Sequence, residues 1–88
     1  MAYTVKFRSS VEKELRNLQK KDQGRVLRKI EALADNPYPP KVKKLPGEEN
    51  YYRIQVGDYR VIYRVEAERL MVRVVKIGHR REVYRRLP

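Results

Sequence analysis

The stretch that decides the fold is YYRIQVGDYRVIYRV, residues 51–65, in which two runs of alternating apolar and polar residues flank Gly57-Asp58. Alternation with a period of two is typical of strands that bury one face. Glycine at the first position of a two-residue loop favours a type II′ turn. These features together predict an antiparallel β-hairpin. Its expected cross-strand pairs are Val56 with Tyr59, Ile54 with Val61, and Tyr52 with Tyr63.

This register divides the side chains of the hairpin between two faces. One face is apolar and continues to Val65, so we expect helices to cover it. A turn around Ala67-Glu68 then leads to a third strand, which alternates in the same way. That strand adds Leu70, Val72 and Val74 to the covered face and Met71, Arg73, Val75 and Ile77 to the other. On the hairpin, the uncovered face holds Tyr51, Arg53, Gln55, Arg60, Ile62 and Arg64.

The uncovered face is mostly positive. Like charges placed directly opposite each other cost energy, so stability does not explain the crowding of arginines. The arginine side chain ends in a planar fork that matches phosphate oxygens, which favours a phosphate-binding surface. The alternative is a solvated polar face on which arginine stems simply cover apolar surface.

The N-terminal half predicts one strand and two helices. Tyr3, Val5 and Phe7 alternate with polar residues, as in a half-buried strand. Ser9 followed by Glu12 has capping-box spacing, and Asp22 is suited to cap a second helix. The second helix must end by Asn36-Pro37, because proline disfavours helical geometry in the residue before it. The apolar stripes of the two helices are Val11, Leu15 and Leu18, and Val26, Leu27, Ile30, Leu33 and Ala34.

Residues 37–49 form a loop rich in proline and lysine. Its three lysines, Lys41, Lys43 and Lys44, either contact phosphates or only keep the connection soluble, while Leu45 anchors it to a core. The expected architecture over residues 1–88 is a single α+β domain. It consists of an N-terminal strand, an αα-hairpin and an antiparallel three-stranded meander, which form one sheet with the helices on one face.

The composition narrows the function. Twenty-two Lys and Arg against eleven Asp and Glu give a net charge of +11 and a pI near 10.2. This excess favours a polyanion, nucleic acid first, with a membrane surface or an acidic protein as alternatives. There is no cysteine and one histidine, so we expect neither a metal nor another cofactor. No apolar run approaches the ~20 residues of a membrane span, and no signal peptide is evident, so we expect a cytoplasmic protein.

Two segments, YYRIQVGDYRVIYRV and VVKIGHRREVYRR (residues 74–86), in this order after a strand and a helix hairpin, resemble the RelE side of the RelE/ParE toxin superfamily. The resemblance covers nearly the whole chain. It implies the toxin of a type II toxin–antitoxin system, a metal-free endoribonuclease that cleaves messenger RNA in the ribosomal A site. It also implies a cognate RelB-like antitoxin as partner.

The resemblance assigns roles to individual residues. Arg60 matches the arginine that stabilises the transition-state phosphate, Arg80 a catalytic arginine, and Tyr84 a tyrosine that stacks on a base. Arg53 and Gln55 stand where the best-known RelE members have lysines. Arginine remains protonated at ordinary pH and glutamine transfers no proton, so the family's lysine base is missing here.

RNA cleavage without a metal requires removal of the 2′-hydroxyl proton, stabilisation of the phosphorane-like transition state and protonation of the leaving oxygen. Arg53 and Arg60 suit the second task. Histidine changes charge near neutral pH, so His79 is either the proton-transfer group or a turn residue without a catalytic part. The expected RNA-binding cations are Lys41, Lys43, Lys44, Arg64, Arg73 and Arg81. A ParE-like inhibitor of DNA gyrase and a catalytically weak RNA- or ribosome-binding relative are the alternative functions.

Overall fold

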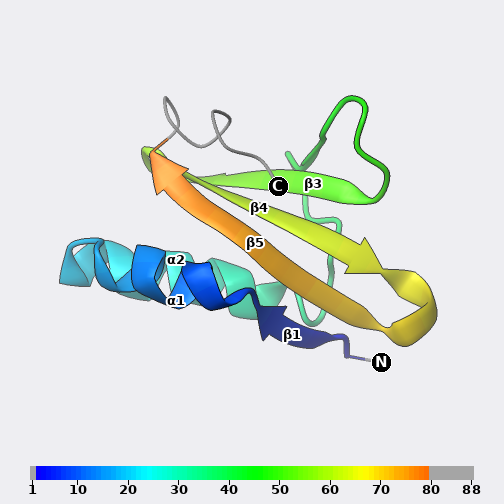
Figure 1. The fold of residues 1–88 in the computed structure, drawn as a ribbon, viewed down its shortest axis with the longest axis horizontal. Coiled ribbons are helices and arrows are strands. Elements are labelled where there is room, and N and C mark those ends of the chain that lie inside the picture. Colours follow the sequence, from blue (N-terminus) through cyan, green and yellow to red (C-terminus); the bar gives the residue numbers. More distant parts are fainter. Residues whose placement is uncertain (1, 80–88) are drawn as a thin grey trace.

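The computed structural model of the chain describes residues 2–79 as two helices and one five-stranded sheet (Figure 1). The sheet has the order β1-β5-β4-β3-β2, in which β1 runs parallel to β5 and the other neighbours are antiparallel. The strands are β1 (Thr4–Phe7), β2 (Lys43–Lys44), β3 (Tyr51–Val56), β4 (Tyr59–Glu66) and β5 (Met71–His79). The predicted α+β class is confirmed. The sheet is mixed, however, and β2 adds a strand that the loop composition did not predict.

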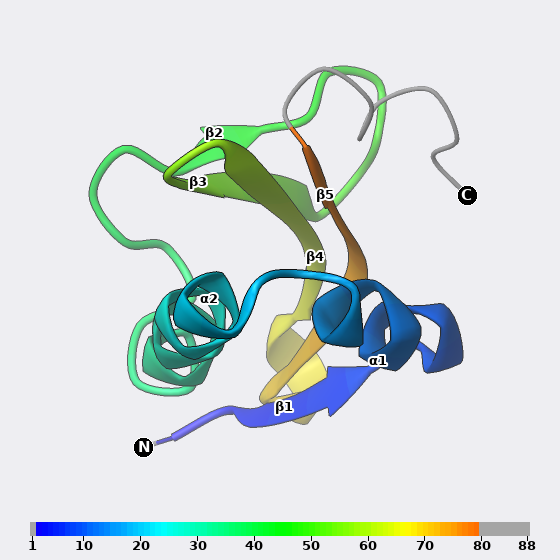
Figure 2. The same ribbon diagram turned by 90° about the vertical axis from the view of Figure 1, so that its left-hand side faces the viewer.

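The two helices cover one face of this sheet (Figure 2). They are α1 (Ser9–Arg16) and α2 (Lys20–Ala32), and no helix within residues 2–79 is long and apolar enough to span a membrane. The predicted side-chain caps are wrong, because neither helix has a capping side-chain hydrogen bond. Instead, the backbone N–H of Arg8 donates to the Val74 carbonyl at 2.9 Å, so contact with β5 fixes where α1 begins.

The β3–β4 hairpin has the predicted register. Ile54 pairs with Val61, Tyr52 with Tyr63 and Val56 with Tyr59, and the turn Gly57 has a φ of 60°. This face packs against the helices in the main core. The buried members are Val11, Val26, Ile30, Leu33, Ile54, Val56, Val61, Tyr63, Val65, Val72, Val74 and Ile77.

Ile77 corrects the predicted face assignment of the third strand. It was expected on the uncovered face, but it pairs with Val61 and belongs to the helix-side core. The cause is a register shift between Ile62 and Tyr63, which pair with Lys76 and Val74. The skipped residue, Val75, is a bulge, and one extra residue reverses the faces of all residues that follow.

The face away from the helices has a small core of its own. Leu45, Ile62 and Val75 are buried together there, with Tyr51 packed against them. The backbone N–H of Leu45 donates to the Tyr51 carbonyl at 2.9 Å, which fastens the loop to the start of β3. The predicted anchoring role of Leu45 is therefore confirmed, but on the face opposite the main core.

Helix α1 completes the edge of β5. Strand β1 pairs with β5 only from Met71 to Val74. Beyond that point, the Glu14 carboxylate accepts a hydrogen bond from the Ile77 N–H at 3.0 Å and lies 2.8 Å from the Lys76 Nζ atom. A side chain of α1 thus occupies the place of a neighbouring strand and fixes the half of β5 that leads to His79.

Candidate functional site

Four arginines lie on the sheet face opposite the helices. In the hairpin, Arg60 pairs with Gln55 across the strands, and Arg64 pairs with Tyr51 on one side and Arg73 on the other. Directly opposed residues share a face, and alternate residues of one strand share it too. Arg53, which pairs with Ile62, therefore joins the same face. The structure brings together Arg53, Arg60, Arg64 and Arg73, as the register predicted, and we call them the arginine face.

Arg60 occupies the central position of this face. It lies on β4 between β3 and β5, is half-buried, and has a buried Nε atom. Its cross-strand partner on β5 is Gly78. On the other side, the Gln55 amide donates to the Gly57 carbonyl at 2.9 Å, so it is held along the hairpin turn.

His79 is not on the arginine face. It pairs with Tyr59, and the two rings lie edge to face with centroids 6.2 Å apart. Tyr59 precedes Arg60 in the same strand, so their side chains point to opposite faces. The structure therefore does not bring His79 and Arg60 together.

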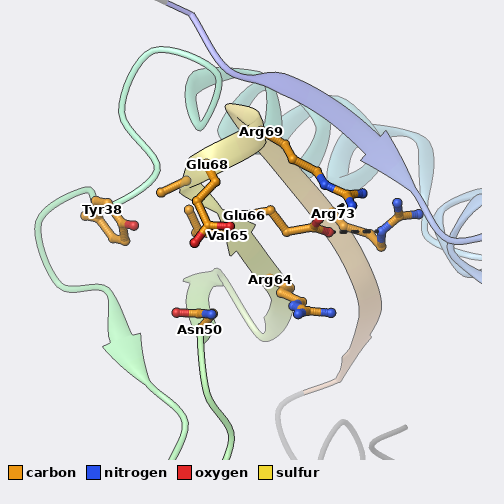
Figure 3. Close-up of a pocket in the computed structure, with 9 residues that line it drawn as sticks. Tyr38, Asn50, Arg64, Val65, Glu66, Glu68, Arg69 and Arg73 are labelled. Atoms are coloured by element: carbon orange, nitrogen blue, oxygen red, sulfur yellow. Dashed lines mark ion pairs between the residues drawn. The ribbon is translucent and has the colours of Figure 1, made fainter.

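Toward the β4–β5 turn, the arginine face includes a carboxylate among its arginines (Figure 3). Glu66 lies between Arg69 and Arg73, at 3.8 and 3.7 Å from their nitrogens. Arg64 is exposed, with its guanidinium carbon 6.0 Å from the centroid of the Tyr51 ring. A carboxylate thus offsets positive charge near Arg73, at the end of the face away from Arg60.

The three predicted RNA-binding lysines lie in different places. Lys43 pairs with Arg53 and so extends the arginine face, whereas Lys44 pairs with Tyr52 and points to the other side. Lys41 lines a hollow beside α2. Within residues 2–79, no group of three His, Asp or Glu side chains is placed to hold a metal ion. Three further predicted site residues, Arg80, Arg81 and Tyr84, lie outside the described residues.

Sequence reasoning overlooked the cations of α2. Arg25, Arg28 and Lys29 line a hollow whose opposite wall includes Gln55, next to Arg60 in the sheet. The signal was present, because a spacing of i, i+3 and i+4 places these residues on one side of a helix. The apolar stripe of α2 identifies the buried side of the helix but says nothing of these charges.

Comparison with known proteins finds one matching family over most of the chain. Residues 2–84 match the family described as the ParE toxin of the type II toxin-antitoxin system, parDE. The chain is 37% identical over 82 residues to a putative RelE-like toxin protein of Escherichia coli, covering 91% of this chain and 85% of that one. It is 30% identical over 88 residues to the putative toxin RelE1 of Methanocaldococcus jannaschii, covering 97% and 98% of the two chains.

Solved structures have the same fold. A chain of the archaeal RelE–RelB complex from Pyrococcus horikoshii OT3 superposes with a TM-score of 0.81 at 35% identity, covering 91% of this chain and 97% of that one. A chain of the intact E. coli RelBE toxin-antitoxin complex gives a TM-score of 0.79 at 28% identity, covering 89% and 96%.

Proposed function

This chain belongs to the RelE/ParE superfamily of type II toxin–antitoxin toxins, and from that premise we propose that it is a ribosome-dependent endoribonuclease. Its substrate is messenger RNA in the ribosomal A site, and it needs no metal. The observation that carries the proposal is the arginine face, with half-buried Arg60 on the central strand of the sheet. Its RelE-like relatives support the RelE side of the superfamily.

Arg60 and Arg53 act on the scissile phosphate. Attack by the 2′-hydroxyl builds negative charge on the equatorial oxygens, and preorganised cations stabilise that charge more in the transition state than in the substrate. Arg60 sits on the central strand, where both neighbouring strands restrict its movement. A guanidinium held in this way can contact two phosphate oxygens at once.

The remaining contributions come from the chain beyond His79. We propose that Arg80 adds a second phosphate contact and that Tyr84 stacks on a base, which aligns the 2′-oxygen with phosphorus. The β3 and β4 positions of the arginine face, from Tyr51 to Arg64, hold neither a carboxylate nor a histidine. We propose that solvent water accepts the 2′-hydroxyl proton and protonates the leaving 5′-oxygen, so that alignment and charge stabilisation supply most of the rate enhancement. His79, on the other face, then has a structural role beside Tyr59.

The test is single-turnover cleavage of message on programmed ribosomes. Arg60→Ala should lower the cleavage rate by roughly 10²-fold, the scale for loss of one preorganised charge stabiliser. Arg16→Ala, which removes an exposed arginine from α1, is the matched control and should cleave at the parent rate. His79→Ala should reduce the rate far less than Arg60→Ala. Parent-like cleavage by a folded Arg60→Ala variant would contradict the phosphate role.

A second candidate is a ParE-like inhibitor of DNA gyrase, which the matching family description favours. Mapping of RNA ends after induced expression separates the two functions. Codon-spaced cuts within translated messages support the nuclease, whereas gyrase-dependent DNA breaks without RNA cuts support the inhibitor. A protein that binds ribosomes but produces neither outcome is the catalytically weak relative.

We also propose a cognate RelB-like antitoxin as a partner, since the similar structures include RelE toxins in complex with RelB. Its acidic residues would neutralise part of the arginine face, including Arg60 and Arg73, and would also meet Arg80 or Arg81. Because the two proposed partners are the ribosome and this antitoxin, we propose that the toxin acts in the cytoplasm. Unimpaired growth of cells that express the chain alone would contradict this pairing.

A further inference from the structure

A groove runs between α2 and the free edge of β3. It consists of two adjoining hollows, one toward the hairpin turn and one toward the loop after α2, which share Lys29, Ala32 and Gln55. Strand β2 pairs only with Tyr52 and Arg53, so it does not cover the edge of β3 from Ile54 to Val56. We call this feature the α2–β3 groove.

The walls of the groove are positively charged. Helix α2 buries Val26 and Ile30, and its cations on the groove side are exposed. Arg25, Arg28 and Lys29 line one wall from α2, and Lys41 lines the other end from the loop. The described residues that line the two hollows include no aspartate or glutamate. The floor is apolar, with Leu33, Ile54 and Val56 buried beneath it.

Arg25 joins the helix to the hairpin turn. A Cβ atom at Gly57 would lie 3.5 Å from the Arg25 Nη1 atom, so the guanidinium rests over the turn. Its ion pair with Asp22 is long, at 3.9 Å, and the Arg25 side chain is 55% exposed. Because this contact is long and the arginine of the pair is exposed to solvent, the pair holds the charge weakly and Arg25 remains able to bind an anion.

The groove is continuous with the arginine face. Gln55 lines both hollows and is also the cross-strand partner of Arg60. An RNA strand with a phosphate at Arg60 would therefore pass Gln55, cross the edge of β3 and reach the cations of α2. The groove has the positive walls and arginine forks that suit a phosphate backbone.

We propose that the α2–β3 groove binds the phosphate backbone of RNA next to the segment held at Arg60. The inference rests on the proposed function, because it takes RNA as the ligand of the arginine face. The bound strand is either the message on one side of the cut or ribosomal RNA beside the A site. An acidic protein segment is the competing occupant, and the experiment separates it.

The experiment compares two variants that lose the same charge. Arg28→Gln/Lys29→Gln alters the groove and spares Arg25, which packs on the turn. Lys13→Gln/Arg16→Gln removes two exposed cations from α1 as the control. The first ligand is a fluorescent single-stranded 2′-O-methyl RNA, which lacks the attacking hydroxyl and stays intact. The second is purified ribosomes programmed with a 2′-O-methyl message, and both are titrated over a range of salt concentrations.

The groove variant should show a shallower dependence of log affinity on log salt concentration. Each lost phosphate contact reduces this slope by about 0.7 for single-stranded nucleic acid, so two lost contacts reduce it by about 1.4. The α1 control should keep the parent slope. A change with the free RNA identifies the message strand, and a change with ribosomes alone identifies ribosomal RNA; both outcomes support the proposal.

Two outcomes overturn it. Equal slopes for parent and groove variant with both ligands exclude an RNA contact, and a loss of antitoxin binding in that variant would then assign the groove to a protein partner. Equal changes in the groove variant and the control would show only a general charge effect. Because these measurements record binding, they remain valid if Arg60→Ala shows that the proposed cleavage mechanism is wrong. A failed groove test with normal cleavage, in turn, leaves the proposed function intact.

Discussion

The two faces of the sheet are built from alternate residues of the same strands, yet they bury very different amounts of apolar surface. Within residues 2–79, the helix side holds a core of twelve buried residues drawn from both helices and three strands. Among the same described residues, the other side holds three, Leu45, Ile62 and Val75, beneath a loop. Burial of apolar area is the main favourable term in folding, so the helix side carries most of the stability.

This division explains why the second face tolerates so many arginines. A face that contributes little burial can hold Arg53, Arg60, Arg64 and Arg73 at modest cost to folding, and their stems also cover apolar surface. Its small apolar cluster still has a task, because Ile62 pairs with Arg53 and lies two residues from Arg60. The cluster thus supports the strands that position the charges.

The largest expected effect comes from truncating the main core. Ile30 and Ile62 are both fully buried, one on each side of the sheet. Ile30→Ala should lower the free energy of unfolding by about 2–5 kcal/mol, the range for large-to-small core changes. The loss of unfolding free energy for Ile62→Ala should lie at the lower end of this range, because the loop that covers Ile62 can move into the cavity left by the truncation. Urea denaturation measures the loss of stability in both variants. An equal or larger loss for Ile62→Ala would show that the second face contributes as much to stability as the main core.

A smaller effect is expected where the core meets the loop after α2. The hydroxyl of buried Tyr63 donates to the Pro37 carbonyl at 2.6 Å. Tyr63→Phe keeps the ring and leaves that carbonyl without its donor, which should cost about 1–2 kcal/mol of unfolding free energy. If the variant is as stable as the parent, the hydrogen bond contributes nothing net, and ring packing alone fixes the loop.

The same substitution has a pH signature. Burial first, and then the neighbouring Tyr52 and Tyr38, raise the pKa of Tyr63 above its ordinary value of 10.0. A raised pKa means that the unfolded chain loses this proton at a lower pH than the folded one. The stabilisation is therefore complete below about pH 10 and is lost as the pH rises further. The stability difference between parent and Tyr63→Phe should narrow in alkaline buffer, and a constant difference would contradict the assigned cause.

The smallest expected effect lies on the arginine face itself. Arg64 is exposed and interacts with the ring of Tyr51. Arg64→Gln should change the free energy of unfolding by no more than about 0.5 kcal/mol, as for most surface substitutions. It should also reduce the salt slope of RNA binding by about 0.7, the value for one phosphate contact. A large loss of stability in thermal denaturation would show that this face supports the fold more than its burial indicates.

Local pattern determined much of this protein. Period-two alternation with Gly57-Asp58 defined the hairpin register, and that register by itself placed Arg53 and Arg60 on one face. The reason is that side chains alternate between the two faces along a strand, and the length of the turn fixes which residues of the two strands lie opposite each other. The helix stripes likewise identified Val11, Val26 and Ile30 as core residues, because helical periodicity is also local.

Tertiary structure decided what depends on residues far apart in the sequence. The bulge at Val75 moved Ile77 into the helix-side core, and it arises from the fit of β5 against β4 rather than from any turn residue. Contact with β5, not a capping side chain, set the start of α1. The position of His79 beside Tyr59, away from Arg60, follows from the same shifted register. Sequence alone supplied the charged residues; the pairing of β4 with β5 and the short length of β2 determined which of them share a surface.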